Sequence, residues 1–300
     1  MKGLELRTSS RLGKGVTFIG FGSLEIGRNW GMGKDKERPD DGNAKEVLDT
    51  VLDVGINLID TASAYHKSEE RIGQFMSGRR NEFVLTSKCG EHNREPGTYY
   101  DFSYMAIKNS IDNSLKLLKT DVIDVMQIHF GPGSQAVLDR GETVAAMKDA
   151  VKAGKVKLLG ASIDGALATR CINSGDFDVM QLGYSLANQG NKDNIALAAE
   201  KGIAVLIRQG FSNGLFTPRV LDKKIWFNLP QMIKVKKLLK LVNNDIKMYM
   251  AVALNFLYMN KGITSVLLGT KKASHVKGNL DLLEMNISDD IMKEAIKIFG

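Results

Sequence analysis

Four polar side chains stand at or just beyond the ends of three apolar runs in the first half of the chain. In chain order they are Asp60 at the end of INLID (56–60), Tyr65 five residues later, Lys88 at the end of FVLTSK (83–88), and His129 at the end of VIDVMQIH (122–129). A carboxylate, a phenol, an ammonium and an imidazole are groups that proteins use to hold and transfer protons. If the three runs are neighbouring strands, their ends bring all four groups together.

The four groups form a plausible proton-donating set. A tyrosine has an ordinary pKa near ~10 and is a poor donor at neutral pH, but a nearby ammonium lowers that pKa. We therefore expect Asp60 to keep Lys88 charged and Lys88 to lower the pKa of Tyr65. His129 would donate to, or orient, the same substrate oxygen. Such a set suits protonation of the alkoxide that develops when hydride reaches a carbonyl carbon.

Each residue also has a purely structural interpretation. Asp60 could cap a helix, Tyr65 could pack in a loop, Lys88 could be solvent-exposed and His129 could be structural. The functional interpretation depends on their coincidence on neighbouring strands, and so on the elements that would position them.

Eight short β-like runs recur along the chain with helical patterns between them. The runs are VTFIG (16–20), INLID (56–60), FVLTSK (83–88), VIDVMQIH (122–129), VKLLGAS (156–162), DVMQL (178–182), IAVLI (203–207) and SVLL (265–268). Near-continuous Val, Ile and Leu are typical of parallel strands covered on both faces. Apolar residues at helical spacing mark helices between them, among others in 103–118, 142–153 and 246–258.

Eight βα units fit either a doubly wound sheet or a closed barrel. The first run is followed by GFGSLEIG, which lacks the G-x-G-x-x-G of the doubly wound dinucleotide fold. We therefore predict an α/β fold, a (β/α)₈ TIM barrel of eight parallel strands, as a single domain over residues 1–300. The first fifteen residues would form a hairpin under the barrel floor. Active sites of such barrels lie at the C-terminal ends of the strands, where the four residues fall.

The composition narrows the partners. The formal net charge is +7, but the basic residues are scattered without interleaved aromatics, so we expect an anionic small molecule and not nucleic acid. No run of 18 or more apolar residues and no apolar leader appear, so we expect no membrane association and no secretion. Cys89 and Cys171 lie far apart, which favours a cytoplasmic location. The four histidines show no metal-ligand spacing, so we expect no metal.

Several motifs together resemble the aldo-keto reductase family, from about residue 16 to residue 285. They are D-T-A-x-x-Y from Asp60 to Tyr65, the following Ser68-Glu69, Lys88, SLKLLKTDVIDVMQIH (114–129) ending on His129, and GKVKLLGAS (154–162). The resemblance implies NAD(P)H-dependent reduction of aldehyde or ketone carbonyls, or oxidation of the corresponding alcohol or sugar. Hydride would pass directly between cofactor and substrate, with Tyr65 as general acid. Asp60, Lys88 and His129 would complete the catalytic set.

The resemblance also implies a cofactor site across the barrel mouth for NADPH, with NADH possible. Ser162 and Gln181 match contacts to the nicotinamide carboxamide, and RQGFSNGLF (208–216) matches the loop over the pyrophosphate. The complete expected set is Gly22, Ser23, Asp60, Ser162, Ile163, Gln181, Arg208, Gln209, Gly210, Phe211, Gly214, Gly269, Thr270, Lys271, Lys272, His275 and Asn279. Independently of the resemblance, a helix starting near Ala273 beside two lysines suits a phosphate.

Three positions depart from the family pattern. Ile163 stands where an asparagine is usual, His66 where a glycine often follows the tyrosine, and Arg208 where many members stack a tyrosine on the nicotinamide. A guanidinium also stacks on flat rings, so function could survive. The chain ends soon after its last helical segment, without the tail of longer members, so we expect a more open pocket.

The substrate and the exact role remain open at this stage. Trp30, His66, Phe130 and the loop 89–103 are the candidate pocket walls, for either a hydrophobic carbonyl or a sugar. One alternative is an NADPH-binding barrel that acts as a regulatory or assembly subunit. Another is an aldolase that forms a Schiff base on Lys88. Cys89 is either a small core residue or a thiol activated by its neighbours. The sequence does not indicate an oligomeric state.

Overall fold

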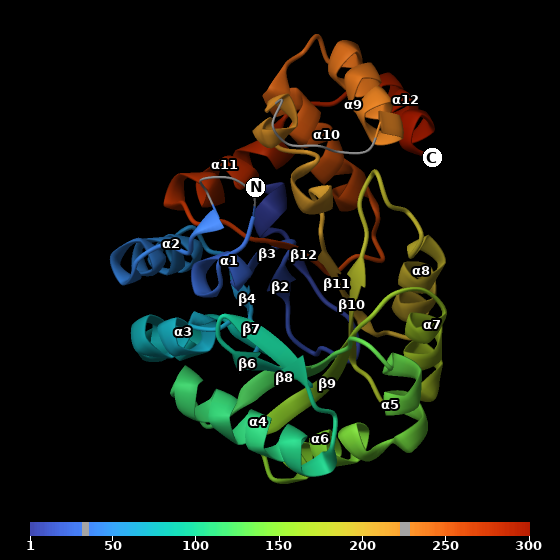
Figure 1. The fold of residues 1–300 in the computed structure, drawn as a ribbon. Coiled ribbons are helices and arrows are strands. Elements are labelled where there is room, and N and C mark those ends of the chain that lie inside the picture. Colours follow the sequence, from blue (N-terminus) through green and yellow to red (C-terminus); the bar gives the residue numbers. More distant parts are fainter. Residues whose placement is uncertain (32–35, 223–228) are drawn as a thin grey trace.

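Eight parallel strands close into a barrel in the computed structural model, which describes residues 1–31, 36–222 and 229–300. The strands, listed in order around the barrel, are β10 (Val179–Gly183), β11 (Ala204–Arg208), β12 (Ser265–Leu268), β3 (Ile19–Gly22), β4 (Leu58–Asp60), β5 (Val84–Cys89), β8 (Ile123–His129) and β9 (Val156–Ser162). Helices surround them (Figure 1). The predicted (β/α)₈ barrel is confirmed.

The helices follow the apolar periodicity of the sequence. They are α1 (Leu24–Gly27), α2 (Asp41–Asp53), α3 (Ser68–Met76), α4 (Tyr104–Leu118), α5 (Ser134–Arg140), α6 (Glu142–Lys152), α7 (Gly165–Ser174), α8 (Lys192–Glu200), α9 (Leu229–Leu241), α10 (Ile246–Met259), α11 (Ala273–Glu284) and α12 (Asp289–Phe299). Several begin at capping side chains: Ser103 accepts a hydrogen bond from the amide of Ala106, and Asp245 accepts one from the amide of Met248. No described helix is long and apolar enough to cross a membrane.

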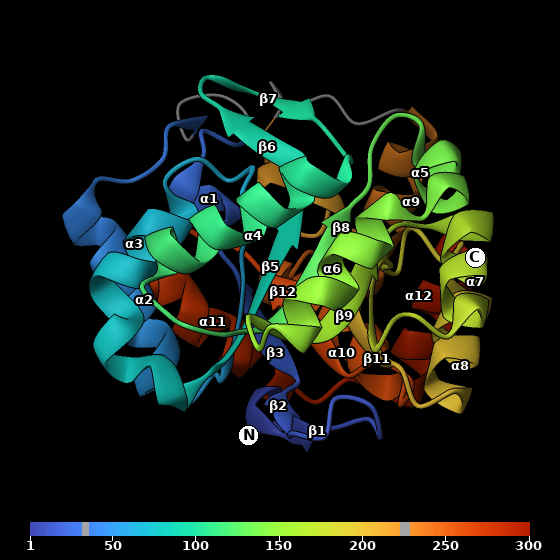
Figure 2. The same ribbon diagram turned by 90° about the horizontal axis from the view of Figure 1, so that it is seen from below.

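The first predicted strand, 16–20, is wrong as a single element. β2 (Val16–Thr17) pairs antiparallel with β1 (Leu6–Arg7), and only β3, which begins at Ile19, enters the barrel. Phe18, the residue between β2 and β3, has its side chain in the hydrophobic core. The expected N-terminal hairpin is present, and Figure 2 shows it at one end of the barrel.

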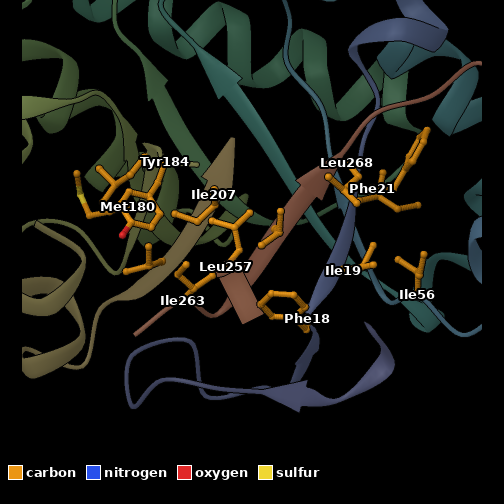
Figure 3. Close-up of a cluster of buried hydrophobic side chains, with 14 of the residues drawn as sticks. Phe18, Ile19, Phe21, Ile56, Met180, Tyr184, Ile207, Leu257, Ile263 and Leu268 are labelled. Carbon is orange, nitrogen blue, oxygen red and sulfur yellow. The ribbon is translucent and has the colours of Figure 1, made fainter. Parts of the chain in front are cut away.

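The buried apolar side chains form two clusters, one between the strands and the helices and one inside the barrel. The larger core cluster joins strands and helices, and Figure 3 shows Phe18, Ile207 and Leu257 within it. A smaller cluster of alternate strand residues fills the barrel interior; it comprises Val16, Leu58, Val84, Val125, Val179, Ala204, Leu206 and Leu267. Because strand side chains alternate, the inward positions two residues further on are Asp60, Thr86, Gln127 and Gln181. The interior is therefore apolar below and polar at the C-terminal mouth.

A second hairpin covers part of that mouth. The predicted loop 89–103 contains β6 (Glu91–Arg94) and β7 (Gly97–Tyr100), which pair antiparallel. Figure 2 shows this hairpin at the end of the barrel opposite β1 and β2. The Pro96-Gly97 pair between two short runs was a turn signal for it. The interpretation of this segment as a plain loop was therefore wrong.

Candidate active site

Asp60 and Lys88 form a buried ion pair at the mouth. The Lys88 ammonium lies 2.6 Å from Asp60 Oδ2, and the exposed fractions of these side chains are 0% for Lys88 and 4% for Asp60. The same ammonium donates to the Thr61 carbonyl at 2.8 Å and to the Tyr65 hydroxyl at 3.3 Å. Asp60 is the last residue of β4, Tyr65 lies in the segment after it, and Lys88 lies in β5. The strands β4 and β5 pair in the barrel. The sequence-predicted chain of contacts from Asp60 through Lys88 to Tyr65 is therefore present.

Polar side chains from three further positions converge on the other oxygen of Asp60. Oδ1 accepts hydrogen bonds from Thr86 Oγ1 at 2.6 Å, Gln127 Nε2 at 3.0 Å and Gln181 Nε2 at 3.0 Å. These bonds hold the carboxylate fixed in a buried place, where an unpaired charge would be costly. Sequence reasoning missed Thr86 and Gln127. The signal for Gln127 was its inward position in β8, two residues before His129.

Burial and neighbouring charges shift the pKa values of both Lys88 and Tyr65. Burial favours the neutral amine, but Asp60 and the Tyr65 hydroxyl outweigh it and raise the pKa of Lys88. Burial raises the pKa of Tyr65, and the opposing effect of Lys88 is smaller. The expected lowering of the Tyr65 pKa is therefore wrong, although Lys88 itself acts in that direction. Tyr65 is a protonated phenol across neutral pH, with an ammonium beside its oxygen.

The ring of His129 contacts the ring of Tyr65. The two rings are edge-to-face, with centroids 6.0 Å apart. Burial lowers the pKa of His129, and the nearby Glu91 carboxylate opposes that shift. His129 Nδ1 lies 2.9 Å from Glu91 Oε2. The structure thus brings all four expected residues together and adds Glu91 from the β6–β7 hairpin.

The residues expected to contact a nicotinamide lie beside this set. Ser162 donates to Gln181 Oε1 at 3.2 Å, and Gln181 donates in turn to Asp60. Ser23 is fully buried and its hydroxyl donates to the Asp60 carbonyl, so its side chain anchors β4 and does not face the mouth. Ile163 packs in the core and offers no polar side-chain contact. The side chains of Ser23 and Ile163 are therefore packed into the fold, and their place in the cofactor site stays a prediction.

Arg208 and the segment after it form the next part of the rim. The Arg208 guanidinium pairs with Asp164 Oδ2. Gln209 is exposed and has a left-handed backbone with φ of 62°, and Gly214 has φ of 95°. Gly210 is buried where a Cβ would lie 2.9 Å from Val266, so the chain is closely packed at this point. The half-buried Phe211 rests on the hydrophobic core.

The N-terminus of α11 completes the rim. Lys272 precedes the helix, and no side chain caps its first turn. Thr270 Oγ1 lies 3.2 Å from His275 Nδ1, while Gly269 packs against the Gly22 carbonyl. Lys271 donates to the carbonyls of Trp30 and Glu37, so this ammonium holds the segment after β3. Asn279 lies half-buried one turn further along the helix.

Most of the chain matches one known protein family. A family model described as the aldo/keto reductase family matches residues 18–298. The chain belongs to the aldo/keto reductase family. It is therefore an oxidoreductase of a family that acts on carbonyls or alcohols with a nicotinamide cofactor.

Individual relatives of this aldo/keto reductase are distant. An NADH-specific methylglyoxal reductase of Escherichia coli is 26% identical, covering 92% of this chain and 94% of the relative. L-galactose dehydrogenase of Arabidopsis thaliana is also 26% identical, covering 93% and 88%. The holo form of an aldo-keto reductase from Bacillus halodurans shares the fold with a TM-score of 0.82 at 23% identity, covering 99% of this chain and 96% of that one.

The rim fits the dinucleotide that the family implies. An uncapped helix N-terminus with the exposed Lys272 beside it suits a phosphate, because backbone N–H groups and positive charge both point there. Ser162 and Gln181 offer a hydroxyl and an amide, which match the hydrogen-bonding groups of a carboxamide. Gly22 is half-buried and Gly269 is exposed, and neither carries a side chain that would keep a ligand from the backbone.

The candidate substrate residues of the aldo/keto reductase differ in their access. Trp30 is 48% exposed, and Phe130 is half-buried in a stack with Phe102, ring centroids 6.4 Å apart. His66 is only 8% exposed, and its Nε2 donates to the Gly97 carbonyl of the hairpin at 3.2 Å. Its φ of 49° is in the left-handed region, which accounts for the glycine usual at this position. The side chain of His66 therefore binds the β6–β7 hairpin.

Cys89 is a core residue. Its side chain is fully buried, and burial raises the pKa of the thiol to about 12. A thiol with a raised pKa and no solvent access is inert. The hypothesis of an activated thiol is therefore wrong.

Proposed function

We propose that this protein is an NADPH-dependent aldo/keto reductase that reduces small aldehydes or ketones, or oxidises the corresponding alcohols or sugars. Its proton donor would be Tyr65. The observation that carries the proposal is the Lys88 ammonium, which touches both the Asp60 carboxylate and the Tyr65 hydroxyl at the barrel mouth. The bound cofactor supplies the hydride. The residues described above supply the proton and the electrostatic environment.

The raised pKa of Tyr65 is compatible with this role. A phenol that stays protonated at neutral pH is ready to donate when an alkoxide, a far stronger base, develops on the substrate. The phenolate left behind lies beside Lys88, whose charge stabilises it. Asp60 keeps Lys88 charged, and Lys88 in turn holds the Tyr65 oxygen in place. His129, with its ring against Tyr65, orients the same substrate oxygen.

Preference for NADPH rests on the cationic end of the rim. Lys272 and His275 flank the start of α11, where a 2′-phosphate would meet positive charge. Lys271 contributes through the segment after β3 that it holds. One relative is named as NADH-specific, so both cofactors belong in the assay.

Lys88 does not fit the aldolase alternative. A Schiff base needs a free, nucleophilic amine. The Lys88 nitrogen is fully buried, paired with Asp60 and bonded to the Thr61 carbonyl, and its pKa is raised by Asp60 and Tyr65 against the effect of burial. Lys88 therefore acts as a fixed positive charge.

The proposal is tested by oxidation of NADPH and NADH in the presence of small aldehydes, ketones and sugars. Tyr65→Phe should lower kcat about 10²- to 10⁴-fold, because it removes the proton donor. Tyr104→Phe is the matched control, since its hydroxyl bonds to Asp149 between α4 and α6 and lies outside the mouth. Equal turnover by wild type and Tyr65→Phe would refute the mechanism.

A further inference from the structure

Two oppositely charged side chains lie next to each other at the wall of the barrel mouth. Glu91 is the first residue of β6, which follows the end of β5, and Arg28 follows the end of α1, which comes directly after β3. Arg28 Nη1 lies 3.9 Å from Glu91 Oε1, and the exposed fractions of these side chains are 24% for Arg28 and 10% for Glu91. Neither residue is one of the four catalytic candidates.

This charged pair lies close to the reacting groups. Glu91 Oε2 lies 2.9 Å from His129 Nδ1. Ser63, in the segment between Asp60 and Tyr65, donates to the Glu91 carbonyl at 2.7 Å. Burial raises the pKa of Tyr65 most strongly, and the Glu91 charge adds to that rise. A substrate whose reacting oxygen meets Tyr65 and His129 would therefore have its neighbouring atoms beside the pair.

Both side chains keep hydrogen-bonding capacity for a ligand. Glu91 Oε1 accepts from Thr98 at 2.6 Å, but Oε2 accepts no hydrogen bond from a described residue and is not sealed from solvent. The Arg28 guanidinium likewise donates no hydrogen bond to a described residue and is not sealed. A carboxylate oxygen is an acceptor only, whereas a guanidinium is a donor only. The mouth therefore offers an acceptor and a donor next to each other.

The charges of the pair favour a neutral ligand with hydroxyl groups. Burial would raise the pKa of Glu91, but His129, Thr98 and Arg28 outweigh it and the pKa is lowered, so Glu91 is a carboxylate at neutral pH. Glu91 repels an anionic ligand, and Arg28 repels a cationic one. An apolar ligand would cover both charges without hydrogen bonds, which is costly. A hydroxyl group both donates and accepts, so it can satisfy either side chain.

We propose that Glu91 and Arg28 form a hydroxyl-binding subsite that selects neutral polyhydroxylated carbonyl compounds, or the matching polyols, as substrates. A hydroxyl near the reacting carbon donates to Glu91 Oε2, and the same or the next hydroxyl accepts from Arg28. Thr98 and Ser63 hold the acceptor in place. The reaction of such a substrate rests on the proposed function, whereas the binding of hydroxyl groups rests only on the pair.

Two aldehydes of equal chain length, glyceraldehyde and propanal, test the subsite. The readout is the ratio of their kcat/KM values, measured with NADPH and with NADH. Wild type should favour glyceraldehyde about tenfold or more. Glu91→Gln keeps the shape but removes the charge that strengthens the hydrogen bond, so the ratio should fall about tenfold. Glu82→Gln is the matched control, because Glu82 also pairs with an arginine, Arg79, but lies before β5, at the other end of that strand.

Binding is measured separately from turnover. Saturation-transfer NMR with glycerol and 1-propanol, on the protein alone and with NADP⁺, should show binding that requires the extra hydroxyl groups and that Glu91→Gln weakens. No preference for glyceraldehyde in wild type, or an equal loss for both aldehydes in Glu91→Gln, would overturn the subsite and leave the proposed function in place. Glycerol binding that depends on Glu91, together with full activity of Tyr65→Phe or no turnover of any carbonyl, would keep the subsite and refute the proposed function.

Discussion

Glu69 shows how burial changes the chemistry of a single side chain. It is 1% exposed on α3, and Ser87 of β5 donates to its Oε1 at 2.6 Å. Its Oε2 is buried without a hydrogen-bond partner in the described part of the chain. Burial raises the pKa of Glu69 to about 7, against the smaller effects of Ser87, Ser114 and Lys88. The folded protein therefore holds a proton on Glu69 that the unfolded chain has released above about pH 4.3.

This proton makes stability depend on pH. Because the folded state binds more protons, the free energy of unfolding should fall as pH rises from about 4.3 to 7 and then level off. Glu69→Gln keeps the neutral shape, so it should stabilise the protein by about 3–4 kcal/mol at pH 8 and have little effect at pH 4.5. Urea unfolding at both pH values measures this difference. The neighbouring and exposed Glu70→Gln is the control, and an equal effect of both substitutions would contradict the assignment.

At the scale of elements, the end of α1 fixes the backbone of Tyr65. A Cβ on Gly27 would lie 2.1 Å from the Tyr65 carbonyl and 2.5 Å from Ser68 Cβ. The Gly27 carbonyl also accepts a hydrogen bond from the amide of Lys67 at 3.3 Å. The segment that carries Tyr65 therefore rests directly on α1, and only glycine permits this contact.

Gly27→Ala should displace this segment. We expect a loss of about 1–3 kcal/mol in the free energy of unfolding, typical of overpacking against a backbone that cannot move freely. The same shift moves Tyr65 away from Lys88, so kcat should fall while the Kd of the cofactor changes less. Gly78→Ala is the matched control, because nothing lies within 4 Å of its added Cβ. Wild-type kcat in Gly27→Ala would show that the contact does not position Tyr65.

The helices and strands differ in how well the sequence predicted them. The strand VKLLGAS and the start of the helix at Ala273 matched the structure, because local apolar spacing and helix signals are sufficient there. The β6–β7 hairpin was missed, because its short runs are polar and partly exposed and lack the apolar periodicity that marks a strand. Gln127 was missed because it lies inside β8 and its partner, Asp60, is remote in sequence.

At the scale of the whole molecule, one end of the barrel carries the candidate active site, and we expect the other end to contribute to stability. Arg7, in the N-terminal hairpin, is buried and donates to the carbonyls of Tyr258, Asn260 and Ile263, at 2.9, 3.2 and 3.0 Å. Two of these carbonyls belong to the end of α10 and the residue after it. A cation at a helix C-terminus also interacts favourably with the helix dipole. Figure 2 shows this hairpin at the end away from β6 and β7.

Arg7→Met should therefore change stability without changing chemistry. Loss of the guanidinium leaves three carbonyls without their donor, so the free energy of unfolding should fall by about 2–4 kcal/mol. The kcat and KM should stay within about twofold of wild type, since distant sites act independently. Chemical unfolding and the carbonyl assay check the two parts. Lys14→Met, an exposed change in the same hairpin, is the control; a large loss of activity in Arg7→Met would show that the two ends are coupled.

The sequence by itself determined the barrel and the residues at its strand ends. Apolar runs of the right length specify buried parallel strands locally, and closure of the barrel then places Asp60, Lys88 and His129 at one mouth. Only the tertiary structure decided the direction of the Tyr65 pKa, the proton on Glu69 and the contact of Glu91 with His129. These properties depend on desolvation and on distances between residues remote in sequence or carried by a hairpin, and both arise only when the chain is packed.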